Sequence, residues 1–156
     1  MTKETHVDDL TILGQTVREP RRELQSFPAP EACTQVVFHS EELTSLCPVT
    51  GQPDHGAITL TYRPGDRCIE SKSWKLYLWS FRDEAHFVEQ LAHRVAHDVV
   101  EAIQPEWVEV EVRQNVRGGI ETTATAELGE RYPMTELTWD ETIDVEVDAI
   151  TGEGAR

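Results

Sequence analysis

The sequence predicts an α+β protein, a four-stranded antiparallel sheet that carries two helices on one face. Two stretches of alternating apolar and polar residues come early in the chain, and two more follow its middle. The segment between these pairs repeats its apolar residues at helical spacing. Because strands and helices come in separate runs instead of alternating, the order favours an antiparallel sheet over a parallel, doubly wound one.

The first 30 residues contain no predicted helix or strand. They carry polar clusters and three prolines, and they show no sustained periodicity beyond a short apolar stretch, LTIL, at residues 10–13. We therefore expect residues 1–30 to form an extended N-terminal arm and the folded body to start near Glu31.

Two strands follow the arm. Residues 34–39, TQVVFH, are β-branched and apolar, and residues 56–63, GAITLTYR, alternate. The connecting segment SLCPVTGQPD contains two prolines and a glycine, which fix and turn the backbone. We expect it to present Cys47 at a defined, exposed position, with Asp54 at its far end.

Two helices are predicted next. The stretch ESKSWKLYLWSF at residues 70–81 has apolar residues at helical spacing, which indicates a short helix. In a second stretch, apolar residues repeat every four positions, at Phe87, Leu91, Val95 and Val99. This predicts a longer helix that Asp83 caps and that ends before Pro105.

The last predicted strands are residues 107–113, WVEVEVR, and residues 120–128, IETTATAEL, joined by the turn NVRGG. The second face of the sheet has no obvious cover, so we expect several copies of the chain to close their sheets into a larger barrel. The chain then becomes acidic, with one weak strand at 143–147 and a disordered end. We predict a folded domain over 31–127 and an acidic extension over 128–156.

The formal net charge of −15, from 14 Lys and Arg against 29 Asp and Glu, argues against nucleic acid and anionic membranes as direct partners. No apolar run approaches the roughly 20 residues of a membrane-spanning helix, and the N-terminus lacks the apolar core of a signal peptide. We therefore expect a cytoplasmic protein.

The three cysteines, Cys33, Cys47 and Cys68, are too few and too widely spaced for a disulfide framework or a thiolate metal cage. His93 and His97 have the spacing of a metal clip without an obvious third ligand, so we expect no metal site. No GxGxxG or GxxxxGK[ST] motif occurs, and any nucleotide must bind without such a loop.

Cys47 and Asp54 are the first candidates for chemistry. A carboxylic acid near a thiol can take up its proton and return it later, as covalent catalysis with a general acid requires. By itself, a cysteine in a strand connection is more often structural, and an aspartate there is an ordinary turn residue. Lys72 and Lys75 at a helix start, and Arg117 before a Gly-Gly turn, are cations that we expect to point outward.

Together with FVEQ and VRGG, the stretches SLCPVTGQPD and ESKSWKLYLWSFR resemble the NADPH-dependent nitrile reductases of queuosine biosynthesis, the 7-cyano-7-deazaguanine reductases. The resemblance covers about residues 31–126 and is to the short, single-module form of the family. It implies the tunnelling fold, in which subunits build pentameric barrels that stack, so a homo-oligomer is expected. Active sites in this family lie between subunits.

By this resemblance, Cys47 is the nucleophile that adds to the nitrile carbon, and Asp54 is the acid that protonates the nitrile nitrogen. The resulting thioimidate is reduced by NADPH, and a second hydride gives the primary amine. A free thiol titrates near about pH 8.5, so Cys47 needs activation, either by proton transfer to an ionised Asp54 or by nearby positive charge. We favour the transfer to Asp54. The resemblance also implies that Lys72 and Lys75 hold the cofactor phosphates, with Arg117 available from a neighbouring subunit.

The small-molecule substrate would meet a second group of residues. Ile69, Glu70 and Ser71 correspond to the family's substrate-contacting segment, and Glu89 to the carboxylate that accepts hydrogen bonds from the deazaguanine amine and ring nitrogen. The family usually has histidine before that glutamate, where this chain has Val88. A valine side chain can neither form a hydrogen bond nor carry a proton. The resemblance therefore implies that Val88 contacts the substrate without such a role.

His86, one helical turn earlier than Glu89, and His55, beside Asp54, are two candidates to compensate for the missing histidine. Two alternatives to the reductase are an amidine-forming relative, which adds ammonia to the same nitrile in transfer RNA, and a non-catalytic binding protein with the same fold. The negative charge and the full ESKSWKLY stretch count against the first, and Cys47 with Asp54 against the second. The reagents consumed separate all three: the reductase oxidises two NADPH per nitrile, the amidine-forming enzyme consumes ammonia and no NADPH, and the binding protein consumes neither.

Overall fold

Six strands and two helices make up residues 10–131, the part of the chain that the structure, a computed structural model, describes. In chain order they are β1 (Ser26–Pro28), β2 (Val36–Leu46), β3 (Pro53–Arg63), β4 (Arg67–Ile69), α1 (Ser71–Trp79), α2 (Val88–Ile103), β5 (Trp107–Arg117) and β6 (Ile120–Gly129). The weak strand predicted at 143–147 lies outside the described residues, as does most of the predicted acidic extension.

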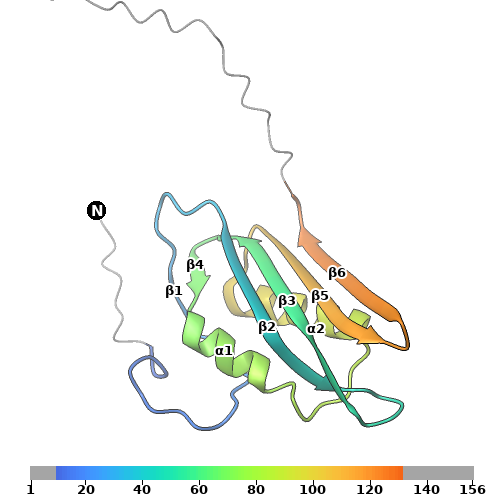
Figure 1. The fold of residues 1–156 in the computed structure, drawn as a ribbon. Coiled ribbons are helices and arrows are strands. Elements are labelled where there is room, and N and C mark those ends of the chain that lie inside the picture. The colour runs from blue at the N-terminus through green and yellow to red at the C-terminus, as the bar shows by residue number, and fades with distance from the viewer. Residues whose placement is uncertain (1–9, 132–156) are drawn as a thin grey trace, which may run out of the picture.

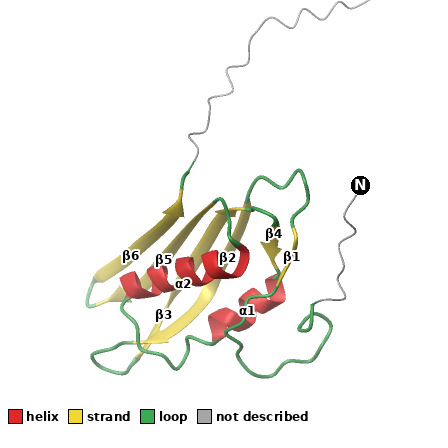
Figure 2. Cartoon of the chain, turned by 180° about the vertical axis from the view of Figure 1, so that it is seen from behind, coloured by secondary structure: helices red, strands yellow, loops and turns green. Residues whose placement is uncertain are grey.

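Four of the strands form one antiparallel sheet in the order β2-β3-β5-β6. Both helices lie on the same side of this sheet, as the two opposite views of Figures 1 and 2 show. Helix α2 packs against β5 and β6, and α1 lies at the β2 edge. The predicted α+β class and the strand, strand, helix, helix, strand, strand order of the main sheet are therefore confirmed.

The core fills the space between the helices and this face of the sheet. Leu60 and Val110 are fully buried on neighbouring strands, and Val95 and Val99 are fully buried on the facing side of α2. They face one another because side chains alternate along a strand and recur every three to four residues along a helix. Each such side chain stabilises the fold by about 1.5–3 kcal/mol through burial.

Strands β2 and β3 are longer than predicted and include both ends of the connecting segment 45–54. A register shift between Ser40 and Leu43 lets β2 continue to Leu46, and Ser45 pairs with Asp54 across the hairpin. The sequence pattern breaks at this bulge because the extra residue reverses which side chains face the core. Asp54 is thus a strand residue, and the turn is confined to the few residues after Leu46.

The predicted Asp83 cap of the long helix is wrong. Helix α2 starts at Val88, and its N-cap residue, Phe87, makes no side-chain capping bond. The residues before it are held elsewhere, because the Leu46 amide donates to the Glu84 carbonyl at 2.8 Å and the His86 amide donates to the Leu46 carbonyl at 3.1 Å. This bridge to the end of β2 keeps residues 84–86 extended, so helix α2 begins only at Val88.

The expectation of a separate arm fails for residues 10–30, where the folded body begins well before Glu31. Strand β1 pairs with β4, and Ile12 is fully buried. Lys72 donates from Nζ to the carbonyl of Ile12 at 2.8 Å and also to that of Gln15. These contacts attach the arm to the first turn of α1.

The face of the sheet away from the helices is polar. Thr59, Glu111 and Thr125 lie side by side across β3, β5 and β6 on this face. Strands β2 and β6 are the two edges of the sheet within residues 10–131. Closure of these edges against other copies of the chain stays a prediction.

Candidate active site

Cys47 lies directly after β2 and is 6% exposed, so the expected exposure of this thiol is wrong for the isolated chain. The turn folds tightly back on itself, because the Cys47 amide donates to the Gln52 carbonyl and the Gly51 amide donates to the Cys47 carbonyl, both at 2.8 Å. Gly51 has φ +69°, a left-handed conformation that glycine adopts without a steric cost. The turn therefore fixes the thiol in a sheltered position.

The surroundings of Cys47 lower the pKa of its thiol from the ordinary value of 9.0 to about 7. The largest cause is a hydrogen bond from the Thr50 side chain, followed by the backbone amides of Thr50 and Val49 and by the guanidinium of Arg117. All of these groups favour the charged thiolate. These contacts therefore make the thiolate of Cys47 more accessible at neutral pH than that of an ordinary thiol.

Asp54 is 5% exposed at the start of β3, and Arg117, at the end of β5, lies between it and Cys47. The guanidinium of Arg117 forms an ion pair with Asp54 Oδ1 through Nη1, and its Nη2 lies 3.7 Å from Cys47 Sγ. Sequence reasoning assigned Arg117 to the cofactor phosphates; the structure places it beside the candidate nucleophile and acid instead. The guanidinium of Arg117 supplies positive charge beside Cys47, and the transfer of the thiol proton to Asp54 stays a prediction.

A small cavity lies next to Asp54, between the β2-β3 hairpin and the start of α2. Asp54, His86 and Val88 all line it. Val88 is half-buried and packs against the core, whereas Glu89, the next residue of α2, is exposed. The structure thus brings Asp54, Val88 and His86 together and leaves Glu89 on the outside of this chain.

The predicted substrate segment 69–71 lies at the start of α1. Ile69 is buried, and its amide donates to the Tyr62 hydroxyl at 2.9 Å. Glu70 is also buried, and its two carboxylate oxygens accept the amides of Lys72 and Ser73 at 2.8 and 2.7 Å. Glu70 is therefore the N-cap of α1, a role that the sequence pattern did not suggest. Ser71 is exposed.

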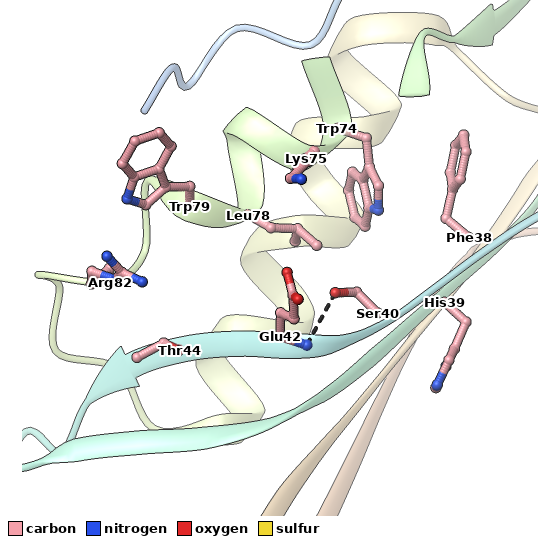
Figure 3. Close-up of a pocket in the computed structure, with 10 residues that line it drawn as sticks. All are labelled: Phe38, His39, Ser40, Glu42, Thr44, Trp74, Lys75, Leu78, Trp79 and Arg82. Atoms are coloured by element: carbon pink, nitrogen blue, oxygen red, sulfur yellow. Dashed lines mark hydrogen bonds between the residues drawn. The ribbon is translucent and has the colours of Figure 1, made fainter. Parts of the chain in front are cut away.

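A larger cavity of about 710 Å³ lies between α1 and β2 (Figure 3). Lys75, Trp79 and Arg82 line it on the helix side, with Glu42 opposite on β2. Trp79 is 37% exposed, which is unusual for so large an apolar side chain. Sequence reasoning had selected Lys75 but missed Trp79 and Arg82, although both lie in the quoted stretch ESKSWKLYLWSFR. Lys72 does not line the cavity, because its ammonium group is bound to the N-terminal arm.

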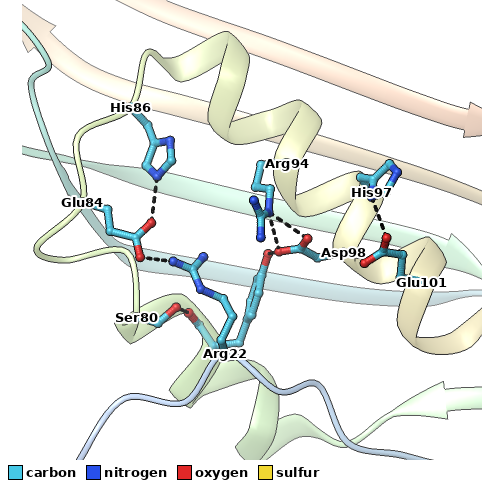
Figure 4. Close-up of polar contacts among 9 residues, drawn as sticks. Arg22, Ser80, Glu84, His86, Arg94, His97, Asp98 and Glu101 are labelled. Carbon is cyan, nitrogen blue, oxygen red and sulfur yellow. Dashed lines mark hydrogen bonds and ion pairs between the residues drawn. The ribbon is translucent and has the colours of Figure 1, made fainter.

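Of the two histidines considered as a metal clip, His97 lies near Asp98 and Glu101 on α2, with their ligand atoms within 4.8 Å of one another. Asp98 already accepts hydrogen bonds from Arg94 (Figure 4) and from the Tyr77 hydroxyl. These bonds satisfy the Asp98 carboxylate without an ion. No helix within residues 10–131 is long and apolar enough to span a membrane.

Comparison with known proteins gives consistent results. The family model described as "QueF-like protein" matches residues 53–133. A protein of Anaeromyxobacter sp. (strain Fw109-5) named NADPH-dependent 7-cyano-7-deazaguanine reductase is 50% identical over 115 residues, which are 72% of this chain and 94% of the relative. A protein of the same name from Syntrophus aciditrophicus (strain SB) is 42% identical over 132 residues, covering 81% of this chain and 94% of the relative.

A solved structure, the apo form of the archaeosine synthase QueF-Like, shares the fold with a TM-score of 0.59. It is 24% identical, and the match covers 64% of this chain and 97% of the other. At this level of identity the likeness supports the architecture described above.

Proposed function

This chain belongs to the QueF-like protein family, and from that membership we propose that it reduces the nitrile of 7-cyano-7-deazaguanine to the primary amine with NADPH, a step of queuosine biosynthesis. The observation that carries the proposal is the group formed by Cys47, Arg117 and Asp54, in a chain 50% identical to a relative named for this reaction. The product serves the modification of transfer RNA, and we accordingly propose a cytoplasmic location.

Cys47 begins the reaction. Its sulfur adds to the nitrile carbon while a proton reaches the nitrile nitrogen, and a covalent thioimidate results. A nitrile is a poor hydride acceptor, whereas the carbon of a protonated thioimidate is electrophilic. The pKa of about 7 at Cys47 supplies the thiolate at neutral pH. Asp54 takes up the thiol proton and passes it to the nitrile nitrogen, and its ion pair with Arg117 holds the carboxylate beside the sulfur.

NADPH supplies the two hydrides, and the cavity between α1 and β2 fits its nucleotide part. The volume of about 710 Å³ lies within the usual range for such ligands. Lys75 and Arg82 provide positive charge for phosphates, and the exposed ring of Trp79 provides a surface for stacking. The Glu42 carboxylate on the facing strand can accept hydrogen bonds from sugar hydroxyls.

The remaining site residues bind the substrate in a homo-oligomer of stacked pentamers, with active sites between subunits. Glu89 is exposed on α2. Its carboxylate can therefore accept hydrogen bonds from the edge of a planar base that binds between this chain and a second copy. The other wall of the substrate site consists of Ile69, Glu70 and Ser71. Glu70 also caps the N-terminus of α1. Val88 provides apolar contact beside Asp54. The polar sheet face and the two open edges support such an assembly.

Replacing Lys75 with alanine is expected to raise the Kd for NADPH about tenfold, because one cation of the phosphate cavity is lost. Formation of the Cys47 adduct should stay unchanged, since Lys75 lies outside the cavity of Asp54. Fluorescence titration with NADPH and mass spectrometry of the adduct measure the two effects. Arg131→Ala removes the same charge at the far end of the sheet and should leave both unchanged; unaltered NADPH affinity in Lys75→Ala would contradict the assignment.

The experiment that tests the proposed function mixes the purified protein with 7-cyano-7-deazaguanine and NADPH. It follows NADPH absorbance and counts the product amine. We expect two NADPH to be consumed per amine. An amidine-forming enzyme would consume ammonia and no NADPH, and a binding protein would consume neither, so either result would refute the proposal.

A further inference from the structure

We propose that His86 relays protons from water to the Asp54 cavity for this reaction, while Glu84, held by Arg22, positions its ring and stabilises its protonated form. The inference rests on the proposed function and adds a proton-transfer residue to it. Three side chains in contact, Arg22, Glu84 and His86, join the N-terminal arm to the loop before α2 (Figure 4).

The geometry fixes the ring of His86 at the cavity. Its Nε2 lies 3.0 Å from Glu84 Oε2, and its ring packs edge-on against Phe81 with 5.7 Å between centroids. Glu84 is held in turn by an ion pair with Arg22. The guanidinium of Arg22 also stacks on Phe81, 4.1 Å from the ring centroid. The side chain of His86 is 22% exposed and lines the cavity with Asp54 and Val88.

The charges around His86 suit a group that gains and loses a proton. The hydrogen bond from Arg22 lowers the pKa of Glu84, and the contact with His86 lowers it further, so Glu84 is an anion that stabilises an imidazolium. Asp54 and His55 of β3 and Arg113 of β5 line the same cavity as His86. An imidazole that is held by a carboxylate and opens into the cavity of a second carboxyl group is suited to move protons.

The proposed reduction needs two protons in addition to its two hydrides. After the thiol proton has moved to nitrogen in the thioimidate, the first hydride goes to carbon and one proton goes to nitrogen. The C–S bond then breaks, leaving an iminium and the Cys47 thiolate. The second hydride gives the amine, and the thiolate takes up the second proton. Asp54 is paired with Arg117 and passes on only the proton that it takes from the thiol, so the two further protons must reach the site from elsewhere, and His86 is placed to supply them.

His86 is a better candidate than His55, the other histidine of this cavity. His55 is exposed on β3, and its Nδ1 lies 3.2 Å from the Thr44 hydroxyl. It has no carboxylate partner within hydrogen-bonding distance among the contacts of residues 10–131. His86 has such a partner in Glu84 and is partly sheltered from water. Val88 lines the same cavity as His86, so a histidine introduced at position 88 would reach the same space.

The test is the variant His86→Asn, which retains a hydrogen-bonding side chain that cannot titrate. We expect the covalent adduct with 7-cyano-7-deazaguanine to form in the absence of NADPH, because the Cys47 proton alone suffices for that step. Steady-state NADPH oxidation should fall about 100-fold, and the pH profile of turnover should lose one ionisation. His93→Asn, an exposed histidine on α2, is the matched control and should behave as wild type.

Rescue separates proton transfer from a structural role. Added imidazole, or Val88→His in the His86→Asn background, should restore part of the lost turnover if the cavity lacks only a proton carrier. Wild-type turnover and pH profile in His86→Asn would overturn the inference, as would a loss that neither imidazole nor Val88→His restores. If the wild-type protein itself forms no adduct and oxidises no NADPH, the proposed function fails, and the two failures are thereby distinguished.

Discussion

Replacing Cys47 with serine is expected to lower NADPH oxidation by at least about 10³-fold and to abolish the covalent adduct with 7-cyano-7-deazaguanine. A serine hydroxyl keeps the size of the side chain but is not ionised near pH 7, so the hydrogen bonds that stabilise the thiolate have no anion to act on. Substrate binding should persist, because the deazaguanine ring is held by other residues. The measurements are NADPH absorbance, intact-protein mass and calorimetric titration with the substrate.

Cys33→Ser is the matched control, since Cys33 lies in the segment between β1 and β2 and its sulfur is more exposed than that of Cys47. This variant should keep wild-type turnover and adduct formation. An adduct that persists in Cys47→Ser, or turnover within tenfold of wild type, would show that another group attacks the nitrile.

Replacing Arg117 with glutamine should have the second largest effect, because one side chain contacts both Asp54 and Cys47. The pKa of Cys47 should rise from about 7 toward the ordinary 9.0, though not fully, since the bonds from Thr50 and Val49 remain. The sign follows from the charge: loss of a cation disfavours the thiolate, so less of it exists at pH 7. Asp54 also loses its ion-pair partner, so its buried carboxylate is left without a neighbouring cation.

Two measurements check this expectation. The rate of iodoacetamide alkylation of Cys47 against pH should show its midpoint near 7 in the wild type and at a higher pH in Arg117→Gln. Turnover at pH 7 should fall about 100-fold and recover partly as the pH is raised. Arg131→Gln, whose guanidinium pairs with Glu109 at the other end of the sheet, should change neither quantity. An unchanged alkylation midpoint in Arg117→Gln would contradict the role assigned to this residue.

The order of helices and strands in the main sheet was predictable because local patterns determine it. The buried face of a strand or helix must be apolar, so burial produces the alternation in residues 107–113 and the four-residue repeat along α2. Both patterns can be read directly from the sequence. Strands β1 and β4 were missed because three residues are too few for a pattern. The start of α2 was misplaced because bonds to Leu46, some 40 residues earlier, hold residues 84–86 away from the helix.

The candidate site was predictable where residue type determines chemistry and not where it depends on distant contacts. Cys47, Asp54 and Lys75 could be selected from their types and motifs. The position of Arg117 depends on the register shift that extends β5 beyond Gln114, and the partnership of Arg22 with Glu84 joins residues 62 positions apart. The burial of Cys47 depends on how tightly one turn closes. None of these contacts leaves a periodic signal in the sequence.

The bridge between Leu46 and residues 84–86 has a consequence for how substitutions combine. It ties the backbone of the nucleophile to the backbone of the histidine, so a change in either loop shifts both groups together. Double-mutant cycles that pair Arg22 or Glu84 with Thr50 should therefore give interaction energies well away from zero, although these residues make no direct contact. Natural variation in the N-terminal arm would for the same reason show epistasis with the turn that carries Cys47.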